Sequence, residues 1–226
     1  MSISFIVPCR NEEQNIEDTT IEIEKCVGKN YDYEIIIIDD YSTDNTRNII
    51  SRLKQNNKKI IQINNDINLG YGGSFIKGLK YASKNYINLM PGDNCFPAEE
   101  ISKMIKDLDD LDLVMSIPKE INDSREKHRK FFSRAFTIIV NILFGYNIRY
   151  YNGIPIVKSQ IIKKLDIKSK SPFFMAEIVL KILKLKLKYD EREIYFIERK
   201  FGKTGIFNLK TIFKTIIDLI KLRINY

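Results

Sequence analysis

Two adjacent carboxylates, Asp39 and Asp40, are the residues of this chain whose type and position most clearly indicate chemistry. They end a run that contains four consecutive isoleucines, 35–38, and such a run predicts a strand buried on both faces. Parallel α/β sheets bind ligands beyond the carboxyl ends of such strands, so the pair is expected to contact a ligand. Asp44 has another explanation as the cap of the next helix, but capping does not account for the pair.

Three more predicted strands in the first half end in polar turns. The strands cover residues 2–7, 59–63 and 86–90, and the turns that follow them cover 8–13, 64–73 and 91–94. Helical stretches separate the strands, a pattern typical of parallel βαβ units with right-handed crossovers. The carboxyl ends of all four strands are therefore expected along one edge of a single sheet.

The four turns, in their order and spacing, resemble the N-terminal half of family 2 glycosyltransferases, with the dolichol-phosphate mannosyltransferase type as the nearest relatives. The matching segments read PCRNEE at 8–13, IDDYSTDNT at 38–46, NLGYGG at 68–73 and LMPGDN at 89–94. The resemblance implies an α/β fold, a single Rossmann-like GT-A domain in which helices flank a mostly parallel central sheet. It divides the chain into a nucleotide-sugar-binding half, 1–117, an acceptor half, 118–205, and a basic tail, 206–226, that forms a C-terminal amphipathic helix.

The resemblance also implies an activity, the inverting transfer of a sugar from a UDP- or GDP-sugar donor to a lipid-phosphate or saccharide acceptor. In the family, the first turn and the acid pair hold the nucleoside. The corresponding residues here are Pro8, Arg10, Glu12, Asp39 and Asp40. The family's Asp-X-Asp turn binds a divalent metal, Mg or Mn, and the donor phosphates, whose charge must be neutralised as the nucleotide departs.

In this chain the metal-binding turn reads Pro91-Gly92-Asp93, so the first acid of the motif is missing. Hard cations accept a single protein carboxylate when phosphate oxygens and waters supply the remaining ligands. Asp93 therefore remains the expected metal ligand and a catalytic residue, and Asn94 could add an oxygen. The alternative is a non-catalytic relative that binds nucleotide-sugars without turnover. The glycines of the third turn are not a dinucleotide-binding fingerprint, because Phe75 occupies the place of the last glycine.

The acceptor half departs further from the family pattern. A fifth strand is predicted over 111–117, and Pro118 and Lys119 follow it where relatives usually carry an arginine. Arg129, ahead of an apolar helical run over 135–144, is a candidate phosphate contact. Arg149 stands where many dolichol-type members carry an acid, and this exchange of charge indicates a different sugar or acceptor.

Two later segments contribute further candidate site residues. Glu177 lies near the start of a predicted helix, where the resemblance implies an acid that faces the site and activates the acceptor; an acid that the helix macrodipole favours is the equal alternative. A strand predicted over 192–198 precedes RKFGKTG at 199–205, which resembles the cationic loop that covers the donor in relatives. Arg199 and Lys203 are its candidate diphosphate contacts. Relatives carry a lysine at the position of Gly205, and Lys203 could take over its role here.

The composition sets the remaining expectations. A chain of 226 residues with 44% hydrophobic content can bury one α/β core, and no linker or repeat marks a second domain. Cys9, Cys26 and Cys95 lack metal-ligand spacing and leave an odd thiol, which indicates a reducing cytoplasm. The apolar start is only one strand long, so no signal peptide is predicted. No nucleic-acid module accompanies the net charge of +8, so nucleic acid is not an expected partner.

The tail leaves two interpretations open. Its apolar residues recur at helical spacing beside lysines, at Leu209, Ile212, Phe213, Ile216 and Ile220. A basic amphipathic helix is typical of membrane-surface binding, but the same stripe is equally compatible with packing on the core. No stretch reaches the roughly 18 uncharged apolar residues that a spanning helix needs. The protein is therefore expected in the cytoplasm, either free or attached peripherally to the inner face of the membrane.

Overall fold

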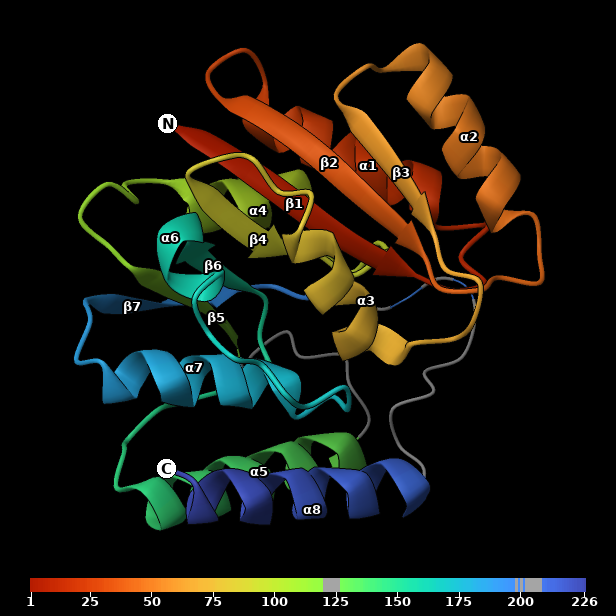
Figure 1. Cartoon of the computed structure of the whole chain (residues 1–226). Helices are drawn as coiled ribbons and strands as arrows, with labels where there is room; N and C mark the ends of the chain where they lie inside the picture. Colours follow the sequence, from red (N-terminus) through yellow and green to blue (C-terminus); the bar gives the residue numbers. More distant parts are fainter. Residues whose placement is uncertain (120–126, 198, 200, 202–208) are drawn as a thin grey trace.

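A seven-stranded sheet forms the centre of the computed structural model, which describes residues 1–119, 127–197, 199, 201 and 209–226 (Figure 1). The strands are β1 (Ser2–Cys9), β2 (Asp32–Asp39), β3 (Ile60–Asn64), β4 (Tyr86–Leu89), β5 (Leu113–Pro118), β6 (Pro155–Lys158) and β7 (Tyr189–Ile194). Their order across the sheet is β3-β2-β1-β4-β6-β5-β7. Only β6 pairs antiparallel, with β4 and β5, so the predicted mostly parallel sheet is confirmed.

The isoleucine run of β2 explains why the sheet is covered on both faces. Ile36 and Ile38 contribute to one hydrophobic cluster, whereas Ile35 and Ile37 contribute to another. Side chains alternate across a strand, so a strand that is apolar at every position needs a hydrophobic layer on each side. The predicted strand buried on both faces is confirmed, because all four isoleucines are fully buried.

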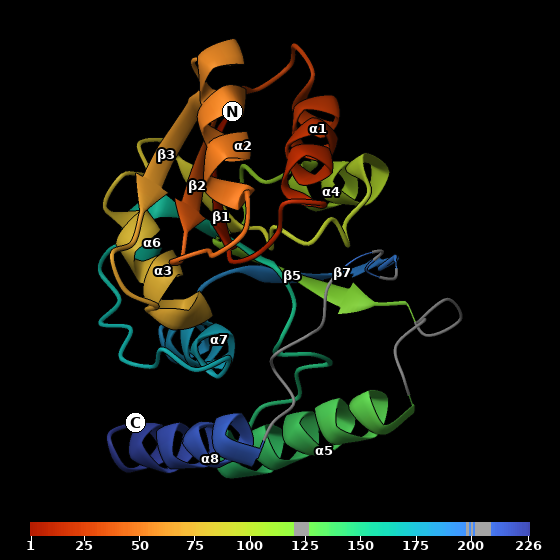
Figure 2. The same ribbon diagram turned by 90° about the vertical axis from the view of Figure 1, so that its right-hand side faces the viewer.

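Helices supply the two layers (Figure 2). The helices α1 (Ile16–Val27), α2 (Thr46–Asn56) and α4 (Ala98–Ile105) cover one face. The helices α3 (Gly70–Leu79), α6 (Ser159–Ile162) and α7 (Phe174–Lys184) cover the other. Two longer helices, α5 (Lys127–Phe144) and α8 (Leu209–Ile224), lie side by side beyond α7 as an outer layer. None of the described helices combines the length and the hydropathy needed to cross a bilayer.

Three local predictions differ from the structure. The short strand β6 was not predicted, and β7 begins three residues before the predicted 192–198 strand. Helix α3 begins at Gly70, although the sequence predicts its start near Ser74, and Gly72 and Gly73 therefore lie inside its first turn. A Cβ on Gly72 would lie 3.0 Å from the Phe174 ring and 3.1 Å from the Lys170 backbone. The glycines therefore allow α3 to pack closely against the segment that enters α7.

Candidate functional site

The carboxyl ends of β1, β2 and β4 meet at one edge of the sheet, as the sequence predicts, because β1 pairs with both neighbours. The Asp40 N–H donates a hydrogen bond of 2.8 Å to the Cys9 carbonyl, which joins the first two ends. The turn after β4 crosses the end of β1 so closely that a Cβ on Gly92 would lie 2.7 Å from the Cβ of Cys9. Only glycine fits at position 92. This close approach holds the predicted metal-binding turn, residues 91–94, over the end of β1.

Each of these three turns contains a non-glycine residue in the left-handed region. The φ angles are 55° for Asn11, 62° for Tyr41 and 55° for Asn94. Asparagine tolerates this conformation, whereas a bulky tyrosine adopts it only where the surroundings enforce it. Backbone strain of this kind clusters at ligand sites, and here it follows the ends of three adjacent strands. Tyr41, whose ring is half-exposed, was not predicted as a site residue, and its position directly after the acid pair was the available signal in the sequence.

Asp40 is bonded mainly to the third turn of the edge. Its carboxylate accepts hydrogen bonds of 2.8 Å from the N–H groups of Leu69 and Gly70 and from the Asn65 side chain. The first two donors are the unpaired amides at the start of α3, so Asp40 caps that helix across the sheet edge. The prediction of a ligand contact must therefore include a structural role. A carboxylate has about four acceptor sites, so one is left for a ligand.

Asp39, like Asp40, is held by hydrogen bonds within the protein at the place where a ligand contact was predicted. It is fully buried and accepts a hydrogen bond of 2.9 Å from Arg47 Nε and one of 3.2 Å from the Ser42 N–H. Arg47, in the first turn of α2, was not singled out from the sequence, since a lone arginine near a helix start gives no signal. Asn11 donates its N–H to Ser42 Oγ, which ties the first turn to the second.

The turn after β4 carries the features that fit a cation. Asp93 Oδ1 and Asn94 Oδ1 are both buried without a hydrogen-bond partner in the structure. A buried oxygen without a partner costs about 1–3 kcal/mol, and two in one turn indicate that a bound group completes them. Oxygen ligands of this type suit Mg²⁺ or Mn²⁺. Within the described residues no three Asp, Glu, His or Cys side chains gather as a metal cluster, so donor phosphates or waters must supply the other ligands.

A buried ion pair lies close enough to Asp93 for the charge of Asp93 to act on it. Arg199, from the segment after β7, forms a salt bridge with Glu12 in the turn after β1. Asn15 Nδ2 donates 2.8 Å to the other carboxylate oxygen and also contacts the Phe201 carbonyl. Burial raises the pKa of Glu12, against the hydrogen bond from Asn15 and the charge of Arg199, and the nearby charge of Asp93 raises it further. The structure therefore brings together three predicted residues, Glu12, Asp93 and Arg199, from distant parts of the chain.

Glu12→Gln is expected to change how stability depends on pH. A carboxyl whose pKa is raised on folding stabilises the protein fully below its unfolded pKa, and this contribution is lost as pH rises through the folded pKa. The wild type should therefore lose stability relative to Glu12→Gln from about pH 4.5 upward. Thermal melts of both proteins across this range measure the difference. A difference that does not change with pH would contradict the assignment.

Glu177 is held by structural contacts. It is buried and accepts hydrogen bonds from the Lys168 and Ser169 N–H groups, at 3.1 and 2.8 Å, and from Lys181 Nζ at 2.6 Å. These contacts fix the segment that leads into α7, and activation of the acceptor by Glu177 stays a prediction. The start of α7 nevertheless borders the site, because Phe174 packs on the ring of Tyr71, whose pKa is raised by burial and by Asp93.

The remaining predicted residues have less defined surroundings. Pro8 is buried in β1, and Arg10 is exposed directly after that strand. Arg129 lies in the first turns of α5, where side chains are not described. Lys203 falls outside the described residues.

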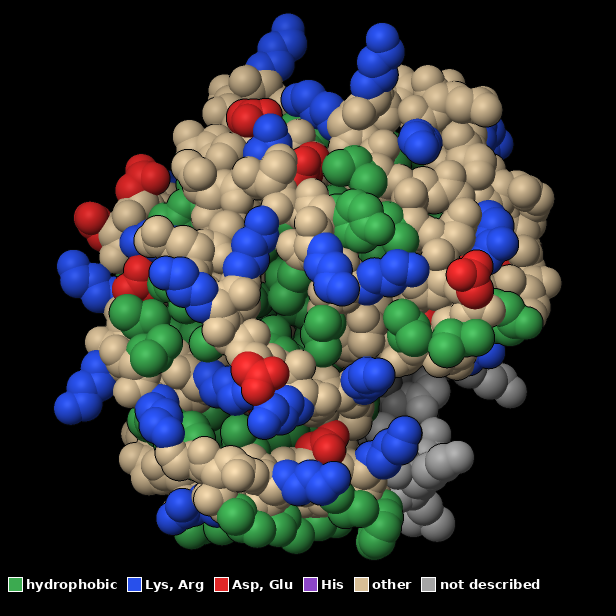
Figure 3. Space-filling model, in the orientation of Figure 1, with side chains coloured by type: hydrophobic (Ala, Val, Ile, Leu, Met, Phe, Trp, Pro, Cys, Tyr) green, Lys and Arg blue, Asp and Glu red, His purple; other side chains and the backbone are tan. Residues whose placement is uncertain are grey.

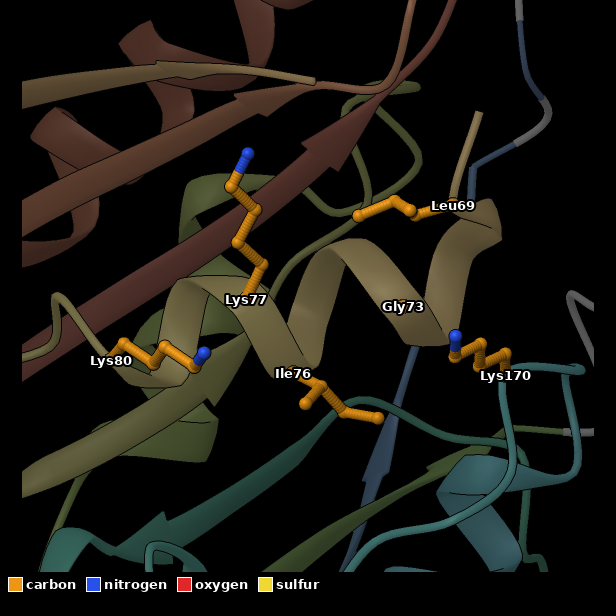
Figure 4. A pocket seen from close by; sticks show the side chains of 6 residues that line it. All are labelled: Leu69, Gly73, Ile76, Lys77, Lys80 and Lys170. Atoms are coloured by element: carbon orange, nitrogen blue, oxygen red, sulfur yellow. The ribbon is translucent and has the colours of Figure 1, made fainter. Parts of the chain in front are cut away.

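An open groove of about 300 Å³ runs along α3, outside this cluster (Figure 4). It is lined by Leu69, Gly73, Ile76, Lys77, Lys80 and Lys170. Its lysines exclude a cation site, and Lys77 donates to Asn65 Oδ1 at 2.7 Å. The groove contains none of the residues predicted for the donor.

The sequence of the chain matches a protein-family model over residues 4–164, more than half of its length. The model describes Glycosyl transferase family 2. The chain belongs to this family. The resemblance seen in the four turns is thereby confirmed at the level of the family, and the dolichol-phosphate mannosyltransferase type is not distinguished by this match.

Two similar proteins match less than half of this chain. Poly-beta-1,6-N-acetyl-D-glucosamine synthase of Staphylococcus aureus (strain COL) is 36% identical over 92 residues, 40% of this chain and 21% of that protein. The synthase of Staphylococcus epidermidis is 33% identical over 107 residues, 46% of this chain and 25% of that protein. The matched part therefore spans at most a quarter of these relatives.

Solved structures share the whole fold of this family 2 chain. Glucosyl-3-phosphoglycerate synthase from Mycobacterium tuberculosis, crystallised with Mn²⁺, UDP-glucose and phosphoglyceric acid, superposes with a TM-score of 0.72 at 15% identity over 98% of this chain and 79% of that one. The same enzyme with Mg²⁺ and UDP gives a TM-score of 0.70 at 14% identity, with 98% and 79% covered. Identities this low establish the shared fold and nothing about substrate.

Proposed function

We propose that this protein is an inverting glycosyltransferase that uses a nucleotide-sugar donor and a divalent metal. The observation that carries the proposal is the pair of partnerless buried oxygens, Asp93 Oδ1 and Asn94 Oδ1, beside the Glu12–Arg199 ion pair. An oxygen site next to a cationic side chain suits a metal-bound diphosphate. UDP with Mn²⁺ or Mg²⁺ in the solved neighbours supports a UDP-sugar, and GDP is the alternative nucleotide.

Different residues of the sheet edge are proposed to bind different parts of the donor. Asp39 and Asp40 retain acceptor sites for hydroxyl or N–H groups of the nucleoside, within hydrogen-bond networks that keep them in place. A metal held by Asp93 and Asn94 would neutralise charge on the departing diphosphate. Arg199 is already at the site through Glu12, and Lys203 is proposed to add a second positive charge. Cationic groups aimed at developing negative charge lower the barrier for transfer.

The acceptor is proposed to be a lipid phosphate or a saccharide, and one contact favours the first. A saccharide hydroxyl needs a base, but the carboxylate of Glu177 already accepts hydrogen bonds from two N–H groups and from the Lys181 ammonium group, so its oxygens are occupied by contacts within the protein. A phosphate acceptor is already anionic and needs no strong base. A lipid phosphate also agrees with the dolichol-type resemblance of the turns. We propose that such transfer takes place at the cytoplasmic face of a membrane.

Binding of nucleotides tests the donor assignment. We expect UDP or GDP, and the matching nucleotide-sugar, to raise the thermal midpoint in the presence of Mn²⁺ and to do so much less in its absence. Slow hydrolysis of the bound nucleotide-sugar, or transfer to a lipid extract, should accompany binding. Binding without either reaction would favour the non-catalytic relative. No binding of any nucleotide, with or without metal, would exclude both.

A further inference from the structure

The outer sides of α5 and α8 form an exposed apolar surface, which we call the α5–α8 face. Its most exposed members are Phe131, Ile138 and Ile142 on α5 and Phe213, Ile220 and Ile224 on α8, each more than half exposed. Figure 3 shows hydrophobic side chains along the lower rim of the molecule, where these two helices lie, with Lys and Arg side chains next to them. An apolar surface shared by two helices marks an interaction site.

The opposite sides of both helices are already committed to the core. On α5, Val140 is fully buried, and the ring of Phe136 packs 6.3 Å from that of Phe173. On α8, Leu219 is buried, and Asp218 accepts hydrogen bonds of 2.6 and 2.7 Å from two serine hydroxyls at the start of α7. The described members of the predicted tail stripe, Phe213, Ile216 and Ile220, are therefore not on the core side of α8, because their side chains are exposed.

The two helices are held together as one unit. The Phe144 and Tyr226 rings meet edge to face at 4.8 Å, and the Tyr226 hydroxyl lies 2.8 Å from that of Tyr146. Arg223 lies over the Phe144 ring at 6.0 Å. Segments some seventy residues apart in the sequence thus present a single surface, which neither segment could form alone.

The positive charge of α5 and α8 favours a negatively charged partner for the α5–α8 face. Together α5 and α8 contain eight Lys or Arg residues and one acid, a net charge of +7 within a chain whose total is +8. The one acid, Asp218, is bonded to serines on the core side. A second copy of the chain would bring +7 against +7, which opposes pairing through this face. A bilayer with anionic lipids offers both an apolar layer and the opposite charge.

We propose that the α5–α8 face attaches the protein peripherally to an anionic membrane surface, with its apolar side chains in the boundary between headgroups and acyl chains. This inference names the surface behind the membrane location proposed above, and it rests on the proposed function only for the identity of the lipid acceptor. Both helices lie flat in the same outer layer, which suits an interfacial position.

Sedimentation with vesicles tests the face. The full chain, without nucleotide or metal, is expected to pellet with phosphatidylcholine vesicles that contain phosphatidylglycerol, to pellet far less with phosphatidylcholine alone, and to be released by high salt. Lys214→Glu with Lys221→Glu should lower the partition coefficient at least about tenfold, because each surface cation contributes attraction to anionic lipid. Lys29→Glu with Lys54→Glu, an equal change of charge elsewhere on the surface, should have a much smaller effect.

The apolar contribution has its own pair of variants. Ile142→Ser with Ile220→Ser should also weaken binding on the order of tenfold, with an unchanged thermal midpoint, since both side chains face solvent. Ile21→Ser with Tyr81→Ser, two exposed apolar side chains on α1 and after α3, should bind like the wild type.

Three results would overturn the proposal. They are equal pelleting on neutral and anionic vesicles, unchanged binding of both α5–α8 variants, and a dimer in solution that Ile142→Ser with Ile220→Ser converts to monomer. The last result would assign the face to a second copy. Nucleotide binding measured without vesicles stays informative in every case, so loss of one proposal is distinguishable from loss of the other.

Discussion

Asp93→Asn is expected to abolish metal-dependent binding of the nucleoside diphosphate and to reduce transfer at least about 100-fold, a typical loss when transition-state charge is no longer stabilised. The turn keeps its shape, because asparagine is nearly isosteric and Gly92 sets the path of the backbone. The substitution removes the negative charge of the Asp93 carboxylate, whose buried Oδ1 has no hydrogen-bond partner in the structure. Calorimetric titration of UDP with and without Mn²⁺, followed by initial rates, measures both effects.

The fold of Asp93→Asn should be at least as stable as that of the wild type. A buried charged oxygen without a hydrogen bond destabilises the folded state in the absence of metal, and the neutral amide removes part of that cost. Asp110→Asn changes an exposed acid between α4 and β5; it is the matched control and should leave binding and rate unchanged. Full wild-type activity in the presence of a chelator would show that cationic side chains replace the metal.

Asp40→Ala is expected to destabilise the protein by at least about 2 kcal/mol, which is the second large effect. The substitution removes the acceptor for the Leu69 and Gly70 N–H groups and for the Asn65 side chain. The Gly70 N–H keeps Asn68 Oδ1 and the Asn65 side chain keeps Ser74 Oγ, so the Leu69 N–H is the donor that loses its acceptor. A donor without a partner costs about 1–3 kcal/mol, and loss of a helix cap costs a further ~0.5–2 kcal/mol. Urea or thermal unfolding measures the change, and nucleotide affinity should fall with it.

Asp66→Ala is the control for this loss of stability. Asp66 is an exposed acid in the same segment between β3 and α3, and its removal should change stability by no more than about 0.5 kcal/mol. Equal stability of Asp40→Ala and Asp66→Ala would mean that the start of α3 does not depend on the cap. Reduced nucleotide affinity with full stability would instead return Asp40 to the role of a pure ligand contact.

The sequence alone determined the layout of the sheet edge, because the relevant signals are local. Four isoleucines in β2 require apolar layers on both faces, and polar turns at the ends of strands separated by helices require a shared edge. The family followed from the residues of those turns. The strand β6 could not be predicted, since its four residues become a strand only by pairing antiparallel with β4 and β5.

Only the tertiary structure decided what the individual side chains do. Asp40 looked like a ligand contact, and the amides that it caps belong to a helix whose start lies thirty residues later. Glu12 and Arg199 are 187 residues apart, so no periodicity could pair them. The tail stripe was ambiguous because a helix presents the same pattern to lipid and to core. Packing of Leu219 and Tyr226 toward the core showed which side of α8 is buried and left Phe213, Ile216 and Ile220 exposed, while membrane binding of that exposed side stays a prediction.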